Sequence, residues 1–447
     1  MEKHHQIAII GAGTAGITVA AQLLRKDRKL DIAIIDPATK HYYQPAWTLV
    51  GAGTYNYKDT ERDMASLIPS GATWIQEAVA AIDPDGNKLT TTKGNVISYD
   101  YLVVCPGLKY DFDGIEGLAD TIDKNEVCSN YTDPDYTWKV LQNFKGGVAL
   151  FTQPATPIKC GGAPQKIMYL ADDYFRKSGV RKDTTVVFAT PGSVIFGVEP
   201  FKQTLMQVVD RKEIGLRYFH KITRIDAKNK IAYFKIVANQ DDPSKLFHNM
   251  GNCAQAIAAD VLAASENPVE LFHNPKDIKV DQVSDTEVGI HYDMLHLAPP
   301  QAAPDFIQQS KLAATEGPDK GWIPVNINSL QHQTYPNVFA LGDVAALPTA
   351  KTGAAVRKQA PVVVENLIHL LKKDPALTGS YEGYSSCPLV TGYGKMVLAE
   401  FKYNNVRDSD PMISTFVDTA KEQWSMWLLK KYMLPFMYWN MMLKGKA

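Results

Sequence analysis

The chain opens on an apolar, β-branched run that breaks into glycines. Residues 6–10 read QIAII and predict a buried strand, and the segment 14–26 behind the glycines predicts a helix. A second apolar run over 30–35 predicts another strand, which ends on Asp36. These patterns indicate a strand–helix–strand unit with both strands parallel in one sheet.

The same succession of elements starts again further along the chain. An apolar strand is expected over 146–154, a helix over 163–177 and another strand over 184–190. We therefore predict an α/β fold with two Rossmann-like domains. The expected regions are a split first domain at 1–112 and 296–365, a second domain at 113–295, and a C-terminal region at 366–447.

Three glycines lie between the first strand and the first helix with the spacing G-x-G-x-x-G. Gly11 suits the tight turn, Gly13 lets the backbone approach a pyrophosphate, and Gly16 lets the helix pack closely on the strand. Asp36 follows at the position where a ribose hydroxyl needs an acceptor. The motif favours a dinucleotide site over an ordinary glycine-rich turn.

Two later segments indicate which dinucleotide is bound. In flavoproteins with two dinucleotide-binding domains, a strand that ends in Gly-Asp reaches the ribityl phosphate, and here such a strand runs into Gly342-Asp343. Another strand ends on Pro106-Gly107, where the chain of such proteins leaves the FAD domain. These matches stand in the correct order and predict FAD as the cofactor.

The second domain lacks a comparable phosphate loop. After the strand expected over 184–190, Gly192 and Gly197 do not have the required spacing. We therefore expect that electrons reach the flavin from a donor other than NAD(P)H.

Composition excludes several other classes of protein. The chain has 447 residues and a net charge of −1, so no basic excess points to nucleic acid. No signal-peptide pattern precedes the first strand. Five cysteines do not indicate a disulfide framework, and no C-x-x-C or H-E-x-x-H motif predicts a metal site.

Two cysteines lie in irregular segments rich in glycine and proline. Cys160 stands in PIKCGGAPQK directly before a predicted helix, whose dipole would lower the thiol pKa together with Lys159 or Lys166. Cys387 stands in SSCPLVTGYGK. Each could be a buried inert cysteine, but the flanking residues favour reactive ones.

With these segments taken together, the chain resembles the sulfide:quinone oxidoreductases of the mitochondrial-like type. They are membrane-attached flavoproteins related to the FAD/NAD(P)-linked disulfide reductases. The resemblance covers nearly the whole chain and is most specific around the two cysteines, which it implies are the redox pair. The flavin-binding positions that it implies are Gly11, Gly13, Gly16, Asp36, Gln44, Val79, Pro106, Gly107, Gly342, Asp343 and Lys430.

The resemblance also implies a reaction. Hydrogen sulfide would attack a bridge between Cys160 and Cys387, and the sulfane sulfur would stay on Cys387 as a persulfide. A small thiol or sulfite would then take this sulfur, while two electrons pass through FAD to ubiquinone or another membrane quinone. The alternative is a type II NADH:quinone dehydrogenase, which would need a second glycine motif.

Three features remain apart from this family pattern. Residues 238–284 form an insertion in the second domain, longer than the family's usual connection. Cys105 lies in an apolar strand and is expected to be structural, whereas a role for Cys128 in sulfur handling is left open. Association into a homo-oligomer is also left open.

The C-terminal segment 424–443 mixes Trp, Tyr and Met with a Lys-Lys pair. Its apolar run is too short to cross a bilayer and suits the membrane interface beside a quinone, although a buried packing helix is the alternative. We expect peripheral attachment to a prokaryotic inner membrane, or to the mitochondrial inner membrane if a transit peptide has been removed. The expected exposed patch comprises Phe436, Met437, Tyr438, Trp439, Met441 and Met442.

Overall fold

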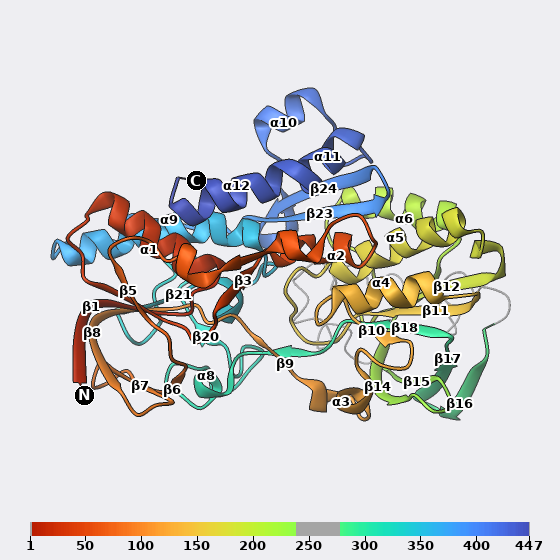
Figure 1. Ribbon diagram of the computed structural model, residues 1–447, viewed down its shortest axis with the longest axis horizontal. Helices are drawn as coiled ribbons and strands as arrows, with labels where there is room; N and C mark the ends of the chain where they lie inside the picture. Colours follow the sequence, from red (N-terminus) through yellow and green to blue (C-terminus); the bar gives the residue numbers. More distant parts are fainter. Residues whose placement is uncertain (1, 238–277, 447) are drawn as a thin grey trace.

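Two α/β lobes lie side by side, and the C-terminal elements extend across the top of both (Figure 1). The computed structural model describes residues 2–237 and 278–446. Most of the predicted insertion at 238–284 therefore lies outside the described residues.

A seven-stranded sheet organises the first lobe. Four of its strands form a parallel array in the order β5-β2-β1-β8; β21 adds parallel to β8, and β7 and β6 continue antiparallel. The strands are β1 (Glu2–Ile10), β2 (Ile32–Ile35), β5 (Ala72–Ile75), β6 (Val79–Asp83), β7 (Lys88–Thr91), β8 (Val96–Val104) and β21 (Val338–Ala340).

Two long helices pack on this sheet. The helix predicted over 14–26 is confirmed as α1 (Thr14–Lys26). α9 (Gly353–Leu371) starts where the Thr352 side chain accepts a hydrogen bond from the backbone N–H of Ala355. Such a side-chain cap explains why this helix begins here.

The second lobe contains a parallel sheet and an antiparallel sheet. The strands and helix predicted over 146–154, 163–177 and 184–190 are confirmed as β11, α5 and β12. The parallel sheet has the order β10 (Val127–Cys128), β18 (Met294–Leu297), β11 (Gly147–Thr152), β12 (Thr184–Ala189) and β13 (Gly215–Arg217), with α5 (Ala163–Ser178) and α6 (Phe201–Lys212) between its strands in the chain. The antiparallel sheet has the order β14 (His220–Asp226), β15 (Ile231–Ile236), β17 (Glu287–His291) and β16 (Val280–Ser284).

Short elements complete both lobes. They are β3 (Lys40–Tyr42), α2 (Trp47–Val50), β4 (Glu61–Asp63), β9 (Lys109–Tyr110), α3 (Leu118–Thr121), α4 (Pro134–Asn143), β19 (Gln301–Ala302), α8 (Asp305–Gln308), β20 (Ile323–Pro324) and β22 (Ala345–Ala346).

The C-terminal region begins with a hairpin and ends in helices. The hairpin strands are β23 (Ser385–Gly392) and β24 (Lys395–Lys402), and β25 (Val406–Arg407) pairs with β24. The helices are α10 (Pro411–Phe416), α11 (Trp424–Leu428), a π-helical turn at Leu429–Met433 and α12 (Leu434–Asn440). Within the described part of the chain, we find no helix with the length and apolar character needed to cross a bilayer.

The prediction of which residues form the exposed C-terminal patch is partly wrong. Tyr438 and Met442 are buried, because α12 and the turn after it pack into the core of the first lobe. Phe436 is 60% exposed, as predicted. The large apolar side chains that do reach the surface in this region are Met412, Phe416, Trp424, Tyr432, Met433 and Phe436, which we call the apolar face.

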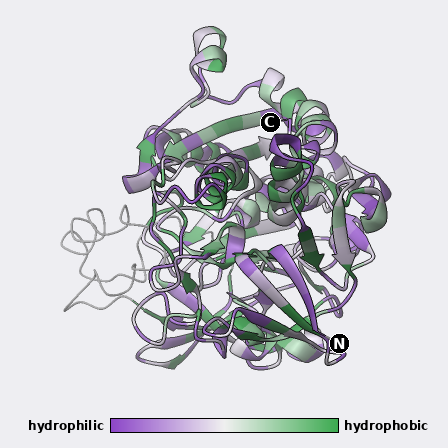
Figure 2. Cartoon of the chain, turned by 90° about the vertical axis from the view of Figure 1, so that its left-hand side faces the viewer, coloured by the Kyte–Doolittle hydropathy of each residue, from purple (hydrophilic) through white to green (hydrophobic). Residues whose placement is uncertain are grey.

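α10 carries the most exposed part of the apolar face. Phe416 is 82% exposed and Met412 is 76% exposed. In Figure 2 this helix projects above the body of the molecule. Sequence reasoning restricted the apolar surface to 424–443 and therefore missed α10.

The burial of the C-terminal end generates a first prediction. Leu443 is 1% exposed and lies in the core of the first lobe, so Leu443→Ala should lower the free energy of unfolding by about 2–4 kcal/mol. Thermal unfolding of the cofactor-loaded protein measures the effect. The exposed Phe436→Ala is the control and should change the stability by no more than about 0.5 kcal/mol. Equal effects of the two substitutions would contradict the packing described here.

Candidate functional site

The glycine loop has the shape that a dinucleotide phosphate requires. A Cβ on Gly11 would lie 2.4 Å from the carbonyl oxygen of Cys105, and one on Gly16 would lie 1.9 Å from that of Gly11. A Cβ on Gly13 would meet no atom within 4 Å, and Gly13 begins α1 without a side-chain cap. Open space in front of uncapped helical N–H groups fits a pyrophosphate.

Asp36 lies at the edge of this loop. Its carboxylate accepts hydrogen bonds from the backbone N–H of Ala12 at 2.7 Å and of Ala38 at 2.8 Å. These bonds fix the carboxylate next to the loop, and each oxygen keeps a lone pair for a ribose hydroxyl.

The other predicted dinucleotide segments converge on the same loop. The Cβ built on Gly11 lies 2.9 Å from Cα of Pro106. Gly107 follows with a φ of +78°, and a Cβ there would meet no atom within 4 Å. Gly342, with a φ of +72°, approaches the Ala15 side chain of α1. The loop, residues 106–107 and Gly342 therefore surround one region at the start of α1.

Cys160 and Cys387 meet although they are 227 positions apart. Their Sγ atoms lie 3.8 Å from each other, and both residues are free thiols. Cys160 belongs to the loop between β11 and α5, and Cys387 belongs to β23. A Cβ on Gly162 would lie 2.5 Å from Sγ of Cys387, so the close approach of the two sulfurs requires glycine at position 162. Sequence reasoning did not single out Gly162.

The Cys160 loop is anchored to the segment that follows Gly342. The backbone N–H of Cys160 donates to the carbonyl of Lys351 at 2.8 Å, and the Tyr131 hydroxyl donates to the carbonyl of Cys160 at 3.2 Å. The Lys351 ammonium in turn donates to the carbonyl of Asp343 at 2.6 Å. Burial lowers the pKa of Lys351 to about 8. Lys351 thus connects the cysteine loop with the predicted flavin segment.

The environment makes the two thiols unequal. The Lys166 ammonium lies 3.0 Å from Sγ of Cys160. The hydrogen bond from Cys387, then Lys166, and then Lys430 hold the pKa of Cys160 well below that of an ordinary thiol. Donating that bond, together with burial, raises the pKa of Cys387. The predicted influence of Lys166 on Cys160 is therefore confirmed.

Two further lysines donate hydrogen bonds to residues 44–45. The Lys159 ammonium donates to Gln44 Oε1 at 2.6 Å. The ammonium of Lys430 donates to the carbonyl of Pro45 at 2.7 Å. Lys430 is 2% exposed, and burial followed by repulsion from Lys166 lowers its pKa to about 7. Its place in the π-helical turn fits the frequent occurrence of such turns at functional sites.

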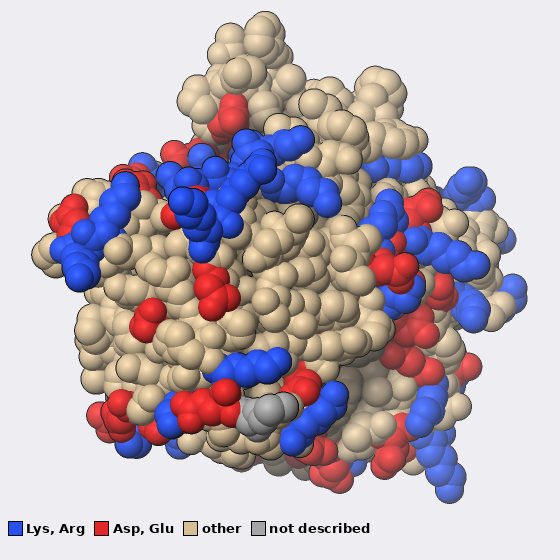
Figure 3. All heavy atoms as spheres, turned by 60° about the vertical axis from the view of Figure 1, so that its left-hand side comes forward, with Lys and Arg blue, Asp and Glu red and all other residues tan. Residues whose placement is uncertain are grey.

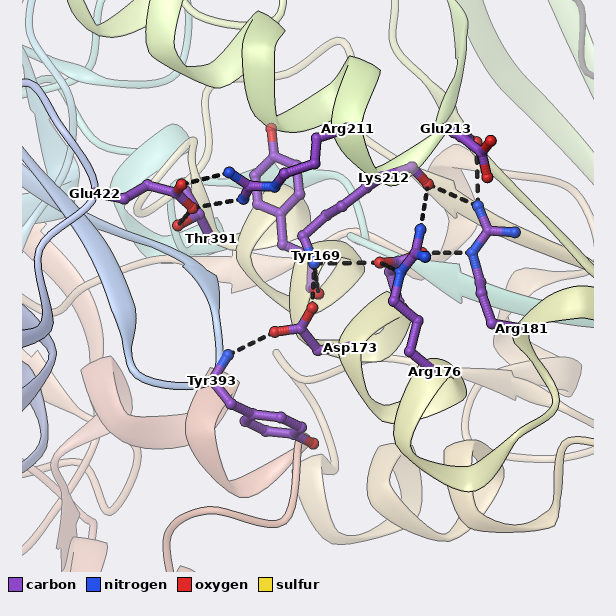
Figure 4. Close-up of polar contacts among 11 residues, drawn as sticks. Tyr169, Asp173, Arg176, Arg181, Arg211, Lys212, Glu213, Thr391, Tyr393 and Glu422 are labelled. Carbon is purple, nitrogen blue, oxygen red and sulfur yellow. Dashed lines mark hydrogen bonds and ion pairs between the residues drawn. The ribbon is translucent and has the colours of Figure 1, made fainter.

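The strand that carries Cys387 is fixed to α5 by buried charge (Figure 4). Just beyond β23, the backbone N–H of Tyr393 donates to Asp173 at 2.7 Å. The Lys212 ammonium pairs with Asp173 and lies 3.2 Å from Asp172. Asp172 is completely buried and also binds Arg176 and Arg181.

A second, partly buried carboxylate holds the end of the same strand (Figure 4). The Thr391 hydroxyl donates to Glu422 at 2.6 Å, and Arg211 donates to both oxygens of Glu422 at 2.7 and 2.8 Å. A bidentate contact of this kind fixes the orientation of the carboxylate as well as its distance from the guanidinium. It joins β23, α6 and the start of α11.

The C-terminal helix reaches the glycine loop. The hydroxyl of Tyr438 lies 2.7 Å from Oγ1 of Thr14 and 2.5 Å from Nε2 of His41. Nδ1 of His41 lies 3.2 Å from the carbonyl of Ala12. α12 therefore supports the loop through polar contacts as well as by packing.

The remaining predicted residues make none of the contacts between the lysines and the two redox thiols. Val79 is buried at the start of β6, the edge strand of the first sheet, where it pairs with Thr91. Cys105 and Cys128 are buried, and burial raises the pKa of both thiols. Neither is therefore suited to act as a nucleophile.

Comparison with known proteins gives consistent results. Residues 5–141 match the family model "Pyridine nucleotide-disulphide oxidoreductase". The chain is 37% identical to the mitochondrial sulfide:quinone oxidoreductase of Mus musculus, over 99% of this chain and 87% of that protein. It is 38% identical to the protein of the same name from Dictyostelium discoideum, over 99% of this chain and 86% of that protein.

A solved structure has the same fold. The sulfide:quinone oxidoreductase from Aquifex aeolicus superposes with a TM-score of 0.71 at 19% identity, and the match covers 100% of this chain and 92% of that one. The relatives and the family model together imply a flavin cofactor.

The contact between Lys166 and Cys160 generates a second prediction. Lys166→Met removes the cation, so the pKa of Cys160 should rise and its alkylation should require a higher pH. Mass spectrometry of the Cys160 peptide after iodoacetamide pulses at a series of pH values measures this shift. Lys159→Met is the matched control and should leave the profile unchanged, since that ammonium binds Gln44. An unshifted profile in the Lys166 variant would disprove the assignment.

Proposed function

Since the chain belongs to the sulfide:quinone oxidoreductase family, we propose that it oxidises hydrogen sulfide and passes two electrons through bound FAD to a membrane quinone. The observation that carries this proposal is the 3.8 Å approach of Cys160 and Cys387 beside Lys166. A disulfide needs a sulfur–sulfur distance of about 2 Å, so a small side-chain movement closes the bridge.

The first step is a thiol–disulfide exchange. Hydrosulfide attacks the Cys387 sulfur of the oxidised pair, the bond between the two cysteine sulfurs breaks, and Cys160 leaves as a thiolate. Cys387 then carries the added sulfur as a persulfide. A small thiolate or sulfite takes the outer sulfur and leaves Cys387 as a thiolate, so that the pair can give up two electrons and close again.

The inequality of the two thiols supports this direction of attack. The thiol with the lower pKa is the better leaving group, and Lys166 and Lys430 lower the pKa of Cys160. The raised pKa of Cys387 makes it the poorer leaving group, which suits the sulfur that stays bound to the added sulfur in the persulfide. The assignment that rested on family resemblance thus has an independent physical reason.

The residues around the glycine loop would hold FAD. Gly11, Gly13 and Gly16 would receive the pyrophosphate and Asp36 the ribose, while residues 106–107 and 342–343 would flank the rest of the cofactor. Lys430 would offer a positive charge from the side of Gln44, and Val79 would lie at the sheet edge. When bound, FAD supplies the redox chemistry between the thiols and the quinone.

The second lobe gives little support to the NADH:quinone dehydrogenase alternative. After β12 the chain runs through residues 190–200 before α6 begins, without a tight glycine turn into a helix. The residues between β11 and α5 hold Cys160 followed by two adjacent glycines, without the spacing G-x-G-x-x-G. Both connections favour a donor that acts through cysteine.

The apolar face supports contact with one side of a membrane. Its residues come from α10, α11, the π-helical turn and α12, and the inner side of the same helices holds Lys430 and Tyr438. Large exposed apolar surfaces mark interaction sites, and a quinone resides in the bilayer. Whether this membrane is a prokaryotic or a mitochondrial inner membrane stays a prediction.

The proposal predicts which donor reduces the flavin. In anaerobic titrations, sulfide should bleach the flavin absorbance and NADH should not. Cys160→Ser and Cys387→Ser should each retain FAD but lose about 100-fold or more of the sulfide-dependent quinone reduction, because the exchange step is removed. Cys105→Ser is the control and should keep near-normal turnover. Reduction by NADH alone, or a fully active serine variant at either site, would overturn the proposal.

A further inference from the structure

Six basic side chains gather at one end of the C-terminal segment. Gly445 packs on α1, since a Cβ there would lie 2.8 Å from the backbone of Ala21 and 2.9 Å from that of Gln22. Its neighbours Lys444 and Lys446 are exposed at this contact. The group, which we call the basic cluster, comprises Arg25, Lys26, Arg28, Lys29, Lys444 and Lys446.

The geometry of α1 brings these residues together although they stand far apart in the sequence. Arg25 and Lys26 follow Ala21 and Gln22 by four residues each, so they share the helix side that Gly445 contacts. Figure 3, which turns this end of the molecule forward, shows Lys and Arg side chains grouped below the projections at the top, which carry few charged side chains.

The basic cluster has no carboxylate partner in the part of the chain that the structure describes. All six side chains are exposed, and no ion pair joins any of them to a carboxylate within residues 2–237 and 278–446. The acidic residue inside this run is Asp27, against four cations at 25–29. Because the net charge of the whole chain is −1, any attraction to an anionic surface must come from such a local group.

We infer that the basic cluster binds the anionic headgroups of phospholipids, and that the protein therefore prefers negatively charged bilayers. The inference rests on the membrane contact of the proposed function and adds the kind of lipid. The apolar face and the basic cluster lie on consecutive elements, since α12 carries the exposed Phe436 and the turn after it ends at the exposed Lys444. Apolar side chains that enter the interface beside lysines that reach phosphates are the two components of interfacial binding.

A bilayer fits this surface better than an acidic protein. Four aromatic side chains of the apolar face are exposed on separate elements along the upper edge of the molecule in Figure 1, namely Phe416, Trp424, Tyr432 and Phe436. Such residues suit a lipid interface, where aromatic rings lie at the level of the headgroups. A protein partner recognised by charge alone would not require them.

Vesicle flotation of the FAD-loaded full chain tests the inference. One set of vesicles is phosphatidylcholine, and in the other about a third of the lipid is phosphatidylglycerol. The protein should bind the anionic vesicles at least about tenfold more tightly at low salt, and added NaCl should reduce this preference. Binding to the neutral vesicles should respond little to salt.

A double variant assigns the preference to the basic cluster. Lys444→Glu with Lys446→Glu should weaken binding to anionic vesicles about tenfold or more and leave neutral vesicles unaffected. Lys177→Glu with Lys182→Glu reverses two exposed lysines on the second lobe and should bind as the unmodified chain does.

The outcomes separate this inference from the proposed function. An unchanged lipid preference in the Lys444/Lys446 variant would overturn it and would leave an acidic protein as the partner of the cluster. Failure to bind either vesicle would overturn the membrane contact itself. Sulfide bleaching of the flavin, measured on the same samples in solution, reports on the enzymatic proposal independently.

Discussion

The ammonium of Lys166 lies 3.0 Å from the sulfur of Cys160, and Lys166 is only 2% exposed. Burial alone would lower the pKa of this lysine, but the sulfurs of Cys160 and Cys387 reverse that effect and raise it. The lysine in turn lowers the pKa of Cys160. In a low-dielectric site the two charges are therefore stable only together, and removal of either leaves the other uncompensated. Reactivity and stability thus depend on one contact.

That contact requires both cysteines to be held in place, and α5 does this for both. The loop of Cys160 leads directly into α5, whose first turns carry Lys166. Two turns further along, Asp173 fixes the end of the strand that carries Cys387 through the backbone of Tyr393. Because one rigid helix positions both segments, the distance between the sulfurs does not depend on the 227 residues that separate them in the chain. The buried lysine, Lys212, that neutralises Asp173 belongs to α6, so the second lobe stabilises this arrangement.

Local features of this fold could be predicted from the sequence. The glycine spacing and the apolar runs predicted α1, α5 and the central strands β1, β2, β11 and β12, because these signals depend only on near neighbours. The requirement for Gly162 could not be predicted, since the atom that excludes a side chain comes from Cys387 in a distant strand. The doubled glycine after Cys160 was the available signal. Similarly, the burial of Tyr438 depends on Thr14 and His41 at the other end of the chain, and hydropathy does not reveal which side of a short helix packs.

The helices from α11 to α12 contact the site on one side and carry the apolar face on the other, and the π-helical turn between them makes this possible. An extra residue in a turn shifts the phase of the helix, so that Lys430 points into the site while Tyr432 and Met433 face outward. The inner side then binds Pro45 and the glycine loop, and the outer side presents the apolar face. Removing this segment would uncover the core of the first lobe, on which Tyr438 packs, and release the support of the loop, so its deletion cannot separate the proposed membrane contact from cofactor binding. Substitutions on the outer side can separate them, because those side chains touch neither the loop nor the thiols. The same geometry puts the proposed membrane contact and the segments proposed to hold the flavin on opposite sides of one layer of helices, which suits the proposed transfer of electrons to a quinone.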